Sequence, residues 1–306
     1  MFVIQYRTIF VSISAVLILG SVIALGVWGL KPAIDFTGGS LIEVSQGDAS
    51  KEDITAVVEE IITETVALRS TDDGFIIRTK ELAPDVVAEV ETAITNISES
   101  TSVLRVSTIG PSLGDELFTK ALIALLLVAL GIIIFIAIAF WKVSKPVSSW
   151  VYGLVTLGTL AHDVLIPAGV FALLGAFAGL EVDALFVVAL LTVLGYSVND
   201  TIVVFDRVRE NLKVNRENEK DEPFENVVGR SLTQTYTRSI NTSLTTIVVL
   251  LALFFFGGSA TEDFALVLII GVAAGAYSSI FFASPLLVMI SHLGSKTNAD
   301  TKKKTQ

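Results

Sequence analysis

Residues 121–141 read ALIALLLVALGIIIFIAIAFW, and this uninterrupted apolar run decides the fold class. At about 1.5 Å of rise per residue, the run is long enough to cross a hydrocarbon core of roughly 30 Å as one helix. Lys120 and Lys142 bracket it, and their long side chains can reach the two membrane interfaces. The run therefore predicts a membrane-spanning helix.

Five further runs have the same apolar character, which fits a chain of 306 residues with 52% hydrophobic and only 17% charged residues. The first run is longer than the core of a signal peptide, so we expect it to be retained. Six spans in a lipid bilayer place both termini on one side, and the chain is predicted to be a polytopic α-helical membrane protein. The five additional spans are expected at residues 8–30, 147–180, 184–205, 233–261 and 264–290.

Composition excludes several classes of function. A net charge of −10 leaves no basic face for DNA or RNA, so we expect no nucleic-acid partner. The chain has no cysteine and only two histidines, which excludes disulfide scaffolds, thiolate catalysis and the common zinc sites. The sequence contains no recognisable catalytic set of a nucleophile, a general base and metal ligands. We expect neither an enzyme nor a bound cofactor or metal.

The distribution of lysine and arginine predicts the orientation. The short loops at 181–183 and 257–263 hold acids and no base, so we place them outside. Both termini are then cytoplasmic, in a multi-pass membrane protein. Four regions follow: the N-terminus with the first span (1–30), an external domain (31–116), a five-span bundle (117–290) and a basic tail (291–306). The segments placed inside carry Arg7, Lys142, Lys145, Arg207, Arg209, Lys213, Arg216, Lys220, Arg230, Lys296 and Lys302 to Lys304.

The external region changes character, because helix and strand periodicities replace continuous apolarity. Ser50 and Asp53 form a capping-box pattern at the start of a helix, and Asp73 with Gly74 is a hairpin signal. The element order is βαββαβ, a ferredoxin-like α+β fold that by itself says nothing about function. The strands are expected at 41–45, 65–69, 75–79 and 103–109, and the helices at 54–62 and 86–97.

Ionisable residues lie within the predicted spans, where a charge costs at least about 2.5–3.5 kcal/mol and needs a partner or a task. Asp200 and Arg238 have similar estimated depths in the cytoplasmic half, which predicts an ion pair; the alternative is that both are anchors at the headgroup boundary. His162 and Asp163 are adjacent in the third span. They form either a hydrogen-bonded packing pair or a functional pair, although neighbouring helix positions do not share a face.

Hydroxyl and amide side chains surround these charges on the fourth and fifth spans. Such groups can hold water at a helix interface, which favours a functional interior over an anchor. Protonation of a carboxylate there could respond to a transmembrane proton gradient. The polar belt comprises Tyr196, Ser197, Asn199 and Thr201 on the fourth span and Asn241 and Thr242 on the fifth, among further Ser and Thr residues.

Glycine pairs at GxxxG spacing occur in the third and sixth spans. Small residues at this spacing let helix backbones approach closely. We therefore expect Gly175 with Gly179, and Gly271 with Gly275, to lie at helix–helix contacts.

Residues 195–211, GYSVNDTIVVFDRVREN, resemble the signature of the SecF family of bacterial protein-export membrane proteins. The segment 34–39, IDFTGG, also fits, as do 161–164, AHDV, and the run 238–246. The resemblance covers nearly the whole chain and implies a membrane architecture of the RND-transporter type. The motif residues are Asp35, Phe36, Gly38, Gly39, Phe205, Asp206 and Arg207.

The resemblance implies a subunit that pairs with SecD and assists the movement of unfolded preproteins through the SecYEG channel, drawing on the proton-motive force. SecA and YajC-type accessory subunits are further implied partners. In the family, the fourth-span aspartate and fifth-span arginine are associated with proton passage, and these are Asp200 and Arg238 here. Asp163 and His162 join them as candidate relay residues.

Two other functions remain open from the residues alone. A half-size RND-type proton-coupled efflux carrier would share the membrane architecture, but the small external domain makes a poor substrate vestibule. A structural assembly factor without a proton role would not need the polar belt.

Overall fold

The computed structural model describes residues 2–45, 47–62, 67–70, 74–98, 100–140 and 147–292. These residues fall into two compact units. The helical unit comprises residues 1–29, 124–174 and 186–306. The second unit, which we call the external unit after its predicted location, comprises residues 30–123 and 175–185.

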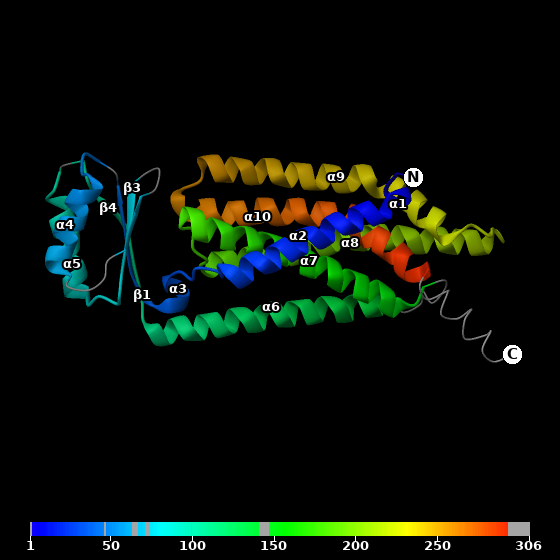
Figure 1. Ribbon diagram of the computed structural model, residues 1–306, viewed down its shortest axis with the longest axis horizontal. Helices are drawn as coiled ribbons and strands as arrows, with labels where there is room; N and C mark the ends of the chain where they lie inside the picture. The colour runs from blue at the N-terminus through cyan, green and yellow to red at the C-terminus, as the bar shows by residue number, and fades with distance from the viewer. Residues whose placement is uncertain are drawn as a thin grey trace. The chain divides into compact units, whose positions relative to one another are not determined.

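Six helices are long and apolar enough to cross a membrane, which confirms the predicted number of spans. The last of them is divided, because a π-helical segment, η1 (Ser278–Ala283), follows α10 (Ser259–Tyr277) and the chain returns to α-helix as far as His292. The other five are α2 (Arg7–Val27), α6 (Pro111–Ala139), α7 (Ser149–Ala178), α8 (Ala184–Glu217) and α9 (Phe224–Phe256) (Figure 1).

Two of these helices extend well beyond the spans expected from the sequence. Helix α8 continues past the predicted end at residue 205, and α9 begins before the predicted start at residue 233. Hydropathy measures only the apolar length, whereas the helices continue because their extensions pack together. Val208 and Val228 are fully buried there in one cluster with Ile4 of the short helix α1 (Phe2–Gln5).

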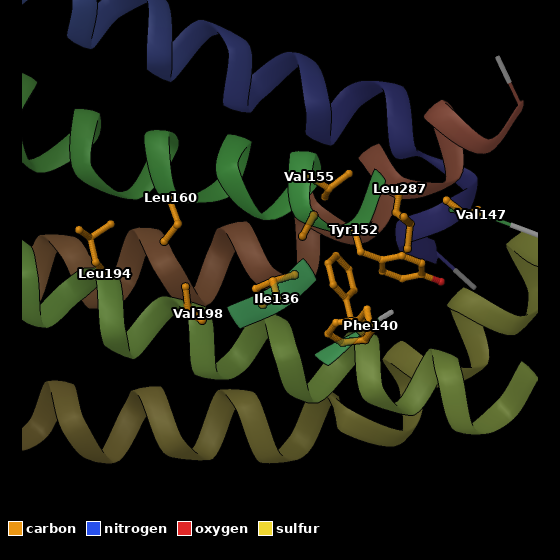
Figure 2. Close-up of a cluster of buried hydrophobic side chains, with 11 residues drawn as sticks. Ile136, Phe140, Val147, Tyr152, Val155, Leu160, Leu194, Val198 and Leu287 are labelled. Carbon is orange, nitrogen blue, oxygen red and sulfur yellow. The ribbon is translucent and has the colours of Figure 1, made fainter. Parts of the chain in front are cut away.

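A cluster of buried aliphatic and aromatic side chains lies in the helical unit near the end of α6 (Figure 2). The rings of Phe140 and Tyr152 are stacked with centroids 5.3 Å apart. Phe205 meets Tyr152 edge-on at 5.2 Å and is fully buried. Phe205, one of the motif residues, therefore has a packing role in this cluster.

The glycine prediction is correct for one pair and wrong for the other. A Cβ added to Gly271 would lie 2.2 Å from a methyl group of Val193 on α8, so this glycine permits a close helix approach. Gly275 similarly lies against Ser197, at 3.0 Å. Gly179 instead follows the end of α7 with a φ of +72°, and a Cβ added there would meet no atom within 4 Å. A Cβ added to Gly175 would lie 3.1 Å from the carbonyl oxygen of Leu180 and 3.7 Å from the Lys31 side chain, and neither residue belongs to another helix.

The external unit contains a four-stranded antiparallel sheet in the order β2-β3-β1-β4. Helices α4 and α5 cover one face of the sheet (Figure 1). Ile42, Ile54, Ile77 and Ile94 are fully buried between the two layers, which confirms the ferredoxin-like α+β prediction. The elements are β1 (Gly39–Ser45), α4 (Lys51–Ile61), β2 (Ala67–Ser70), β3 (Gly74–Thr79), α5 (Pro84–Thr95) and β4 (Val103–Ile109).

The predicted capping box and hairpin of this unit can be compared with the structure where their residues are described. Ser50 caps α4 and forms the expected reciprocal box with Asp53. The first half of the predicted strand 65–69 and the hairpin residue Asp73 lie outside the described residues. The two strands that the hairpin would join are antiparallel, with Ser70 opposite Phe75.

Candidate functional site

Asp163 is the most fully bonded ionisable side chain in the described part of the helical unit. It is fully buried on α7. Ser278 donates a hydrogen bond of 2.8 Å to its Oδ2, and Ser197 of α8 donates to the same oxygen. Nδ1 of His162 lies 2.7 Å from Oδ1. The carboxylate thus joins α7, α8 and η1.

The π-helical segment supplies part of this network. Ser279, beside Ser278, shares a hydrogen bond of 3.1 Å with Thr201 of α8. Both serines remain bonded to the carbonyl of Gly275, at 3.1 and 2.9 Å. π-helical turns are rare, interrupt α-helices as single turns, and are frequent at functional sites. Here the two serines bond side chains of α7 and α8, so this part of the last helix makes polar contacts as well as apolar ones.

His162 is held by rings on two sides. Its imidazole is fully buried and lies parallel to Tyr277, with centroids 6.0 Å apart, and to Phe282 at 5.4 Å. Its Nε2 has no hydrogen-bond partner among the residues that the structure describes. His162 and Asp163 are hydrogen-bonded to each other although they are adjacent on the helix, because both side chains lean toward the same buried space.

Asp200 lies on a neighbouring face of α8, one turn after Ser197, and faces α9. It is 4% exposed, and its neighbours there are the hydroxyl groups of Ser239 and Ser243. Its Oδ2 atom is buried without a hydrogen-bond partner in the described ranges. An unpartnered buried oxygen is uncommon in proteins, and it is costly when the group is charged.

The predicted ion pair between Asp200 and Arg238 is wrong as a direct contact. No salt bridge within 4 Å joins them in the part of the chain that the structure describes, and they interact only over a longer distance. The reason is the rotation of α9: Ser239 points toward α8, so its neighbour Arg238 is turned by about 100° and is exposed. Arg238 therefore faces away from Asp200 in this chain.

The polar belt divides between two helix interfaces. Tyr196 faces α9, where its hydroxyl lies 3.4 Å from those of Ser243 and Thr246. Ser197 and Thr201 instead face α7 and η1, which the sequence did not predict. The remaining members lie apart from both: Asn199 and Asn241 are exposed, and Thr242 bonds the carbonyl of Arg238.

Two motif residues at the far end of α8 are exposed and paired locally. Asp206 forms an ion pair with Arg209, one turn along the helix. Arg207 similarly contacts Glu210 at 2.7 Å. Exposed pairs of this kind contribute little stability.

The glycine motif belongs to the external unit. Asp35 accepts a hydrogen bond of 2.8 Å from the backbone N–H of Ala184, the first residue of α8. Phe36 is buried and meets Phe118 edge-on at 5.7 Å. Gly38 has a φ of +72° and leaves room for the backbone of Pro111, while Gly39 does the same for the carbonyl of Thr79.

The two carboxylates on the faces of α8 can do different chemistry. Asp163 accepts hydrogen bonds from Ser197 and Ser278, which hold its side chain in place. Asp200 has a free oxygen that can take up a proton and then donate to a serine hydroxyl of α9. Within the described ranges, no group of three or more histidine and carboxylate side chains could hold a metal ion.

Sequence reasoning did not select Ser278 and Ser279 as site residues. Their signal was a polar pair within an otherwise apolar span. The contact to Asp163 could not be inferred from it, because spacing alone does not tell which face of one helix meets another.

Comparison with known proteins gives a consistent assignment. The model of the family described as "Protein export membrane protein SecD/SecF, C-terminal" matches residues 89–293. The protein translocase subunit SecF of Thermobaculum terrenum is 40% identical over 301 residues, covering 94% of this chain and 92% of the relative. The SecF of Anaerolinea thermophila is 36% identical and covers 92% of both chains.

The fold comparison agrees. The crystal structure of SecDF, described as a translocon-associated membrane protein from Thermus thermophilus, superposes with a TM-score of 0.81 at 31% identity. The match covers 94% of this chain but 38% of the SecDF chain. Six apolar helices and these relatives make the protein a multi-pass bacterial membrane protein. The chain belongs to the SecF family of the SecD/SecF protein-export membrane proteins.

Proposed function

We propose that the protein works as the SecF subunit of a SecDF complex that uses the proton-motive force to assist preprotein translocation across the cytoplasmic membrane. The single observation that carries the proton role is Asp200, a buried carboxylate with an unpartnered oxygen on a membrane-spanning helix. Intramembrane carboxylates in such positions are typical of proton relays. The family assignment supports the role in protein export.

Arg238 and the Asp163–His162 pair complete the proposed relay in different ways. Arg238 is exposed in this chain, so its partner is expected on another subunit, and SecD is the natural candidate. Asp163 and His162 form a second buried polar cluster against the neighbouring face of α8. Protonation of Asp200 would change the hydrogen bonds of α8 on the α9 side, and the change would pass to the adjacent face that contacts Asp163.

The proposed partners are SecD, the SecYEG channel with SecA and YajC-type subunits, and an unfolded preprotein. The protein would act without enzymatic chemistry, and we place both termini in the cytoplasm because the basic loops lie on that side.

Co-purification from native membranes, followed by vesicle export assays, tests this function. We expect SecD and Sec channel subunits in the eluate, and export by inverted vesicles that falls when an uncoupler collapses the proton gradient. Vesicles that lack the protein should lose the gradient-dependent part of preprotein export. An outer-membrane efflux partner in the eluate, with export insensitive to removal of the protein, would favour the carrier alternative.

A further inference from the structure

The loop between α7 and α8 pairs with the segment that leads from α2 into the external domain. The N–H of Ala33 donates to the carbonyl of Val182 at 2.8 Å, and the N–H of Val182 donates to the carbonyl of Lys31 at 2.8 Å. Pro32 and Val182 thereby form a parallel β-bridge. The loop belongs to the same compact unit as the external domain.

Asp35 adds a side-chain contact to this pairing. Its hydrogen bond from the N–H of Ala184 is made with the first turn of α8. The first N–H groups of a helix have no partner inside the helix and carry a partial positive charge. A carboxylate at this position acts as an N-cap, and here it comes from a segment distant in sequence. Asp35 thus holds the start of α8 from the external unit.

An ion pair makes the third contact. Arg78 of β3 bonds Glu181, and their side chains are 18% and 28% exposed. The charges of Arg69 and Lys31 also attract the Glu181 carboxylate, and the charge of Asp35 attracts Arg78. The β-bridge, the helix cap and the ion pair therefore involve residues within the four consecutive positions 181–184, at the end of the loop and the start of α8.

We propose that Asp35 and Arg78 are positioning residues that fasten the external domain to the N-terminus of α8. Helix α8 is continuous from Ala184 to Glu217, and Asp200 lies about 24 Å along it. A shift or rotation of α8 on protonation would be passed to the external domain through these contacts. This coupling rests on the proposed function of Asp200, whereas the fastening itself does not.

The fastening is tested by amide hydrogen exchange on the full chain in lipid nanodiscs. Asp35→Ala should raise the exchange of the Ala184 amide on the order of tenfold, because one hydrogen bond is lost. Asp35→Asn keeps an acceptor oxygen, so the exchange rate of the Ala184 amide should change by less than about threefold. Glu59→Ala, on the exposed face of α4, is the matched control and should have no effect. Equal exchange of the Ala184 amide in wild type and Asp35→Ala would contradict the proposal that Asp35 caps α8.

Charge reversal tests the ion pair separately. Arg78→Glu should raise exchange across residues 180–184, and the double variant with Glu181→Arg should restore part of the protection. Arg105→Ala removes an exposed arginine of β4 and serves as the control. A double variant no better protected than Arg78→Glu would contradict a positioning role for this pair.

A disulfide tests the coupling. The chain has no cysteine of its own, and Pro32→Cys with Val182→Cys places two thiols on bridged strands, whose Cα atoms are about 5 Å apart and within disulfide range. The oxidised pair should keep gradient-dependent export and should restore it in an Asp35→Ala background. Loss of export on oxidation, failure to restore it, or failure to cross-link would each overturn the proposal.

The two hypotheses fail differently. If wild-type export ignores the proton gradient, the proposed function fails while the exchange results still decide the fastening. If Asp35→Ala leaves both the exchange and the gradient response unchanged, the fastening fails and the proposed function stands.

Discussion

Ser278 donates a hydrogen bond of 2.8 Å to the carboxylate of Asp163, and it does so from the first residue of the π-helical segment η1. Ser197 donates to the same oxygen from α8. The last span therefore bonds two other spans through a buried carboxyl group and not only through apolar packing. A buried polar group that loses its hydrogen-bond partner costs about 1–3 kcal/mol, so this contact is a substantial local restraint.

Removing the Ser278 hydroxyl should destabilise the helical unit. Ser278→Ala leaves Asp163 with one donor fewer in a buried site, and we expect a loss of about 1–3 kcal/mol in unfolding free energy. Ser291→Ala is the control, because that hydroxyl bonds the carbonyl of Val288 in its own helix. Denaturant unfolding in detergent measures the stability of both purified variants. Equal stability of the two variants would mean that the contact is not formed.

The close approach of α10 and α8 gives a steric prediction. Gly271→Ala would place a methyl group 2.2 Å from a Val193 methyl, so the helices must separate, at a cost of about 1–3 kcal/mol. Gly195→Ala adds the same methyl on α8, where nothing lies within 4 Å, and should be neutral or slightly stabilising. Thermal unfolding in detergent compares them. A tolerated Gly271→Ala would contradict this helix packing.

The ion pair in the external unit predicts a pH dependence. Burial raises the pKa of Glu181 above its ordinary value of 4.5, although Arg78, Arg69 and Lys31 each lower it. Consider two states of the loop at 181–183: a closed state with Glu181 buried, and an open state with Glu181 in water. At pH values between 4.5 and the raised pKa, Glu181 binds more protons in the closed state than in the open state. The free energy of opening therefore falls as pH rises through the raised pKa.

Hydrogen exchange of the loop amides, corrected for the intrinsic effect of pH, measures this dependence. Glu181→Gln should flatten it, because the titrating group is gone. Protection that instead increases with pH in wild type would show that attraction to Arg78 outweighs the burial of Glu181.

Membrane topology can be checked directly, because the chain contains no cysteine. Gly258→Cys introduces a thiol where a Cβ meets no atom within 4 Å. It should react with an impermeant maleimide added to intact cells with a permeabilised outer membrane. Lys220→Cys, between α8 and α9, should react only after lysis. The reverse labelling pattern would overturn the predicted orientation.

The span number and the external fold follow from sequence for a physical reason. Apolar length determines whether a helix can cross a membrane, as in residues 121–141. Period-2 and helical patterns identify the βαββαβ order because one face of each element must be buried. Ser50 and Asp53 mark a helix start within a single turn. Each of these signals is local.

The contacts of the site depend on relations between distant segments, which no local signal specifies. Asp200 and Arg238 have matching depths, but a helix rotation of about 100° between Ser239 and Arg238 decides which of them meets α8. The cap of Ala184 by Asp35 likewise joins residues far apart in the chain. Depth can be counted from a sequence, whereas helix rotation is set by packing.

The gradient response of Asp200→Asn tests the central claim most directly. The substitution removes the titrating group at nearly constant shape, and Glu217→Gln on the same helix, beyond its apolar stretch, is the matched control. Preprotein export is measured in inverted vesicles with and without a proton gradient, at equal levels of assembled protein. We predict that wild type and Glu217→Gln export faster with the gradient, whereas Asp200→Asn exports at the gradient-free rate in both conditions. Full gradient-dependent stimulation by Asp200→Asn would contradict the account.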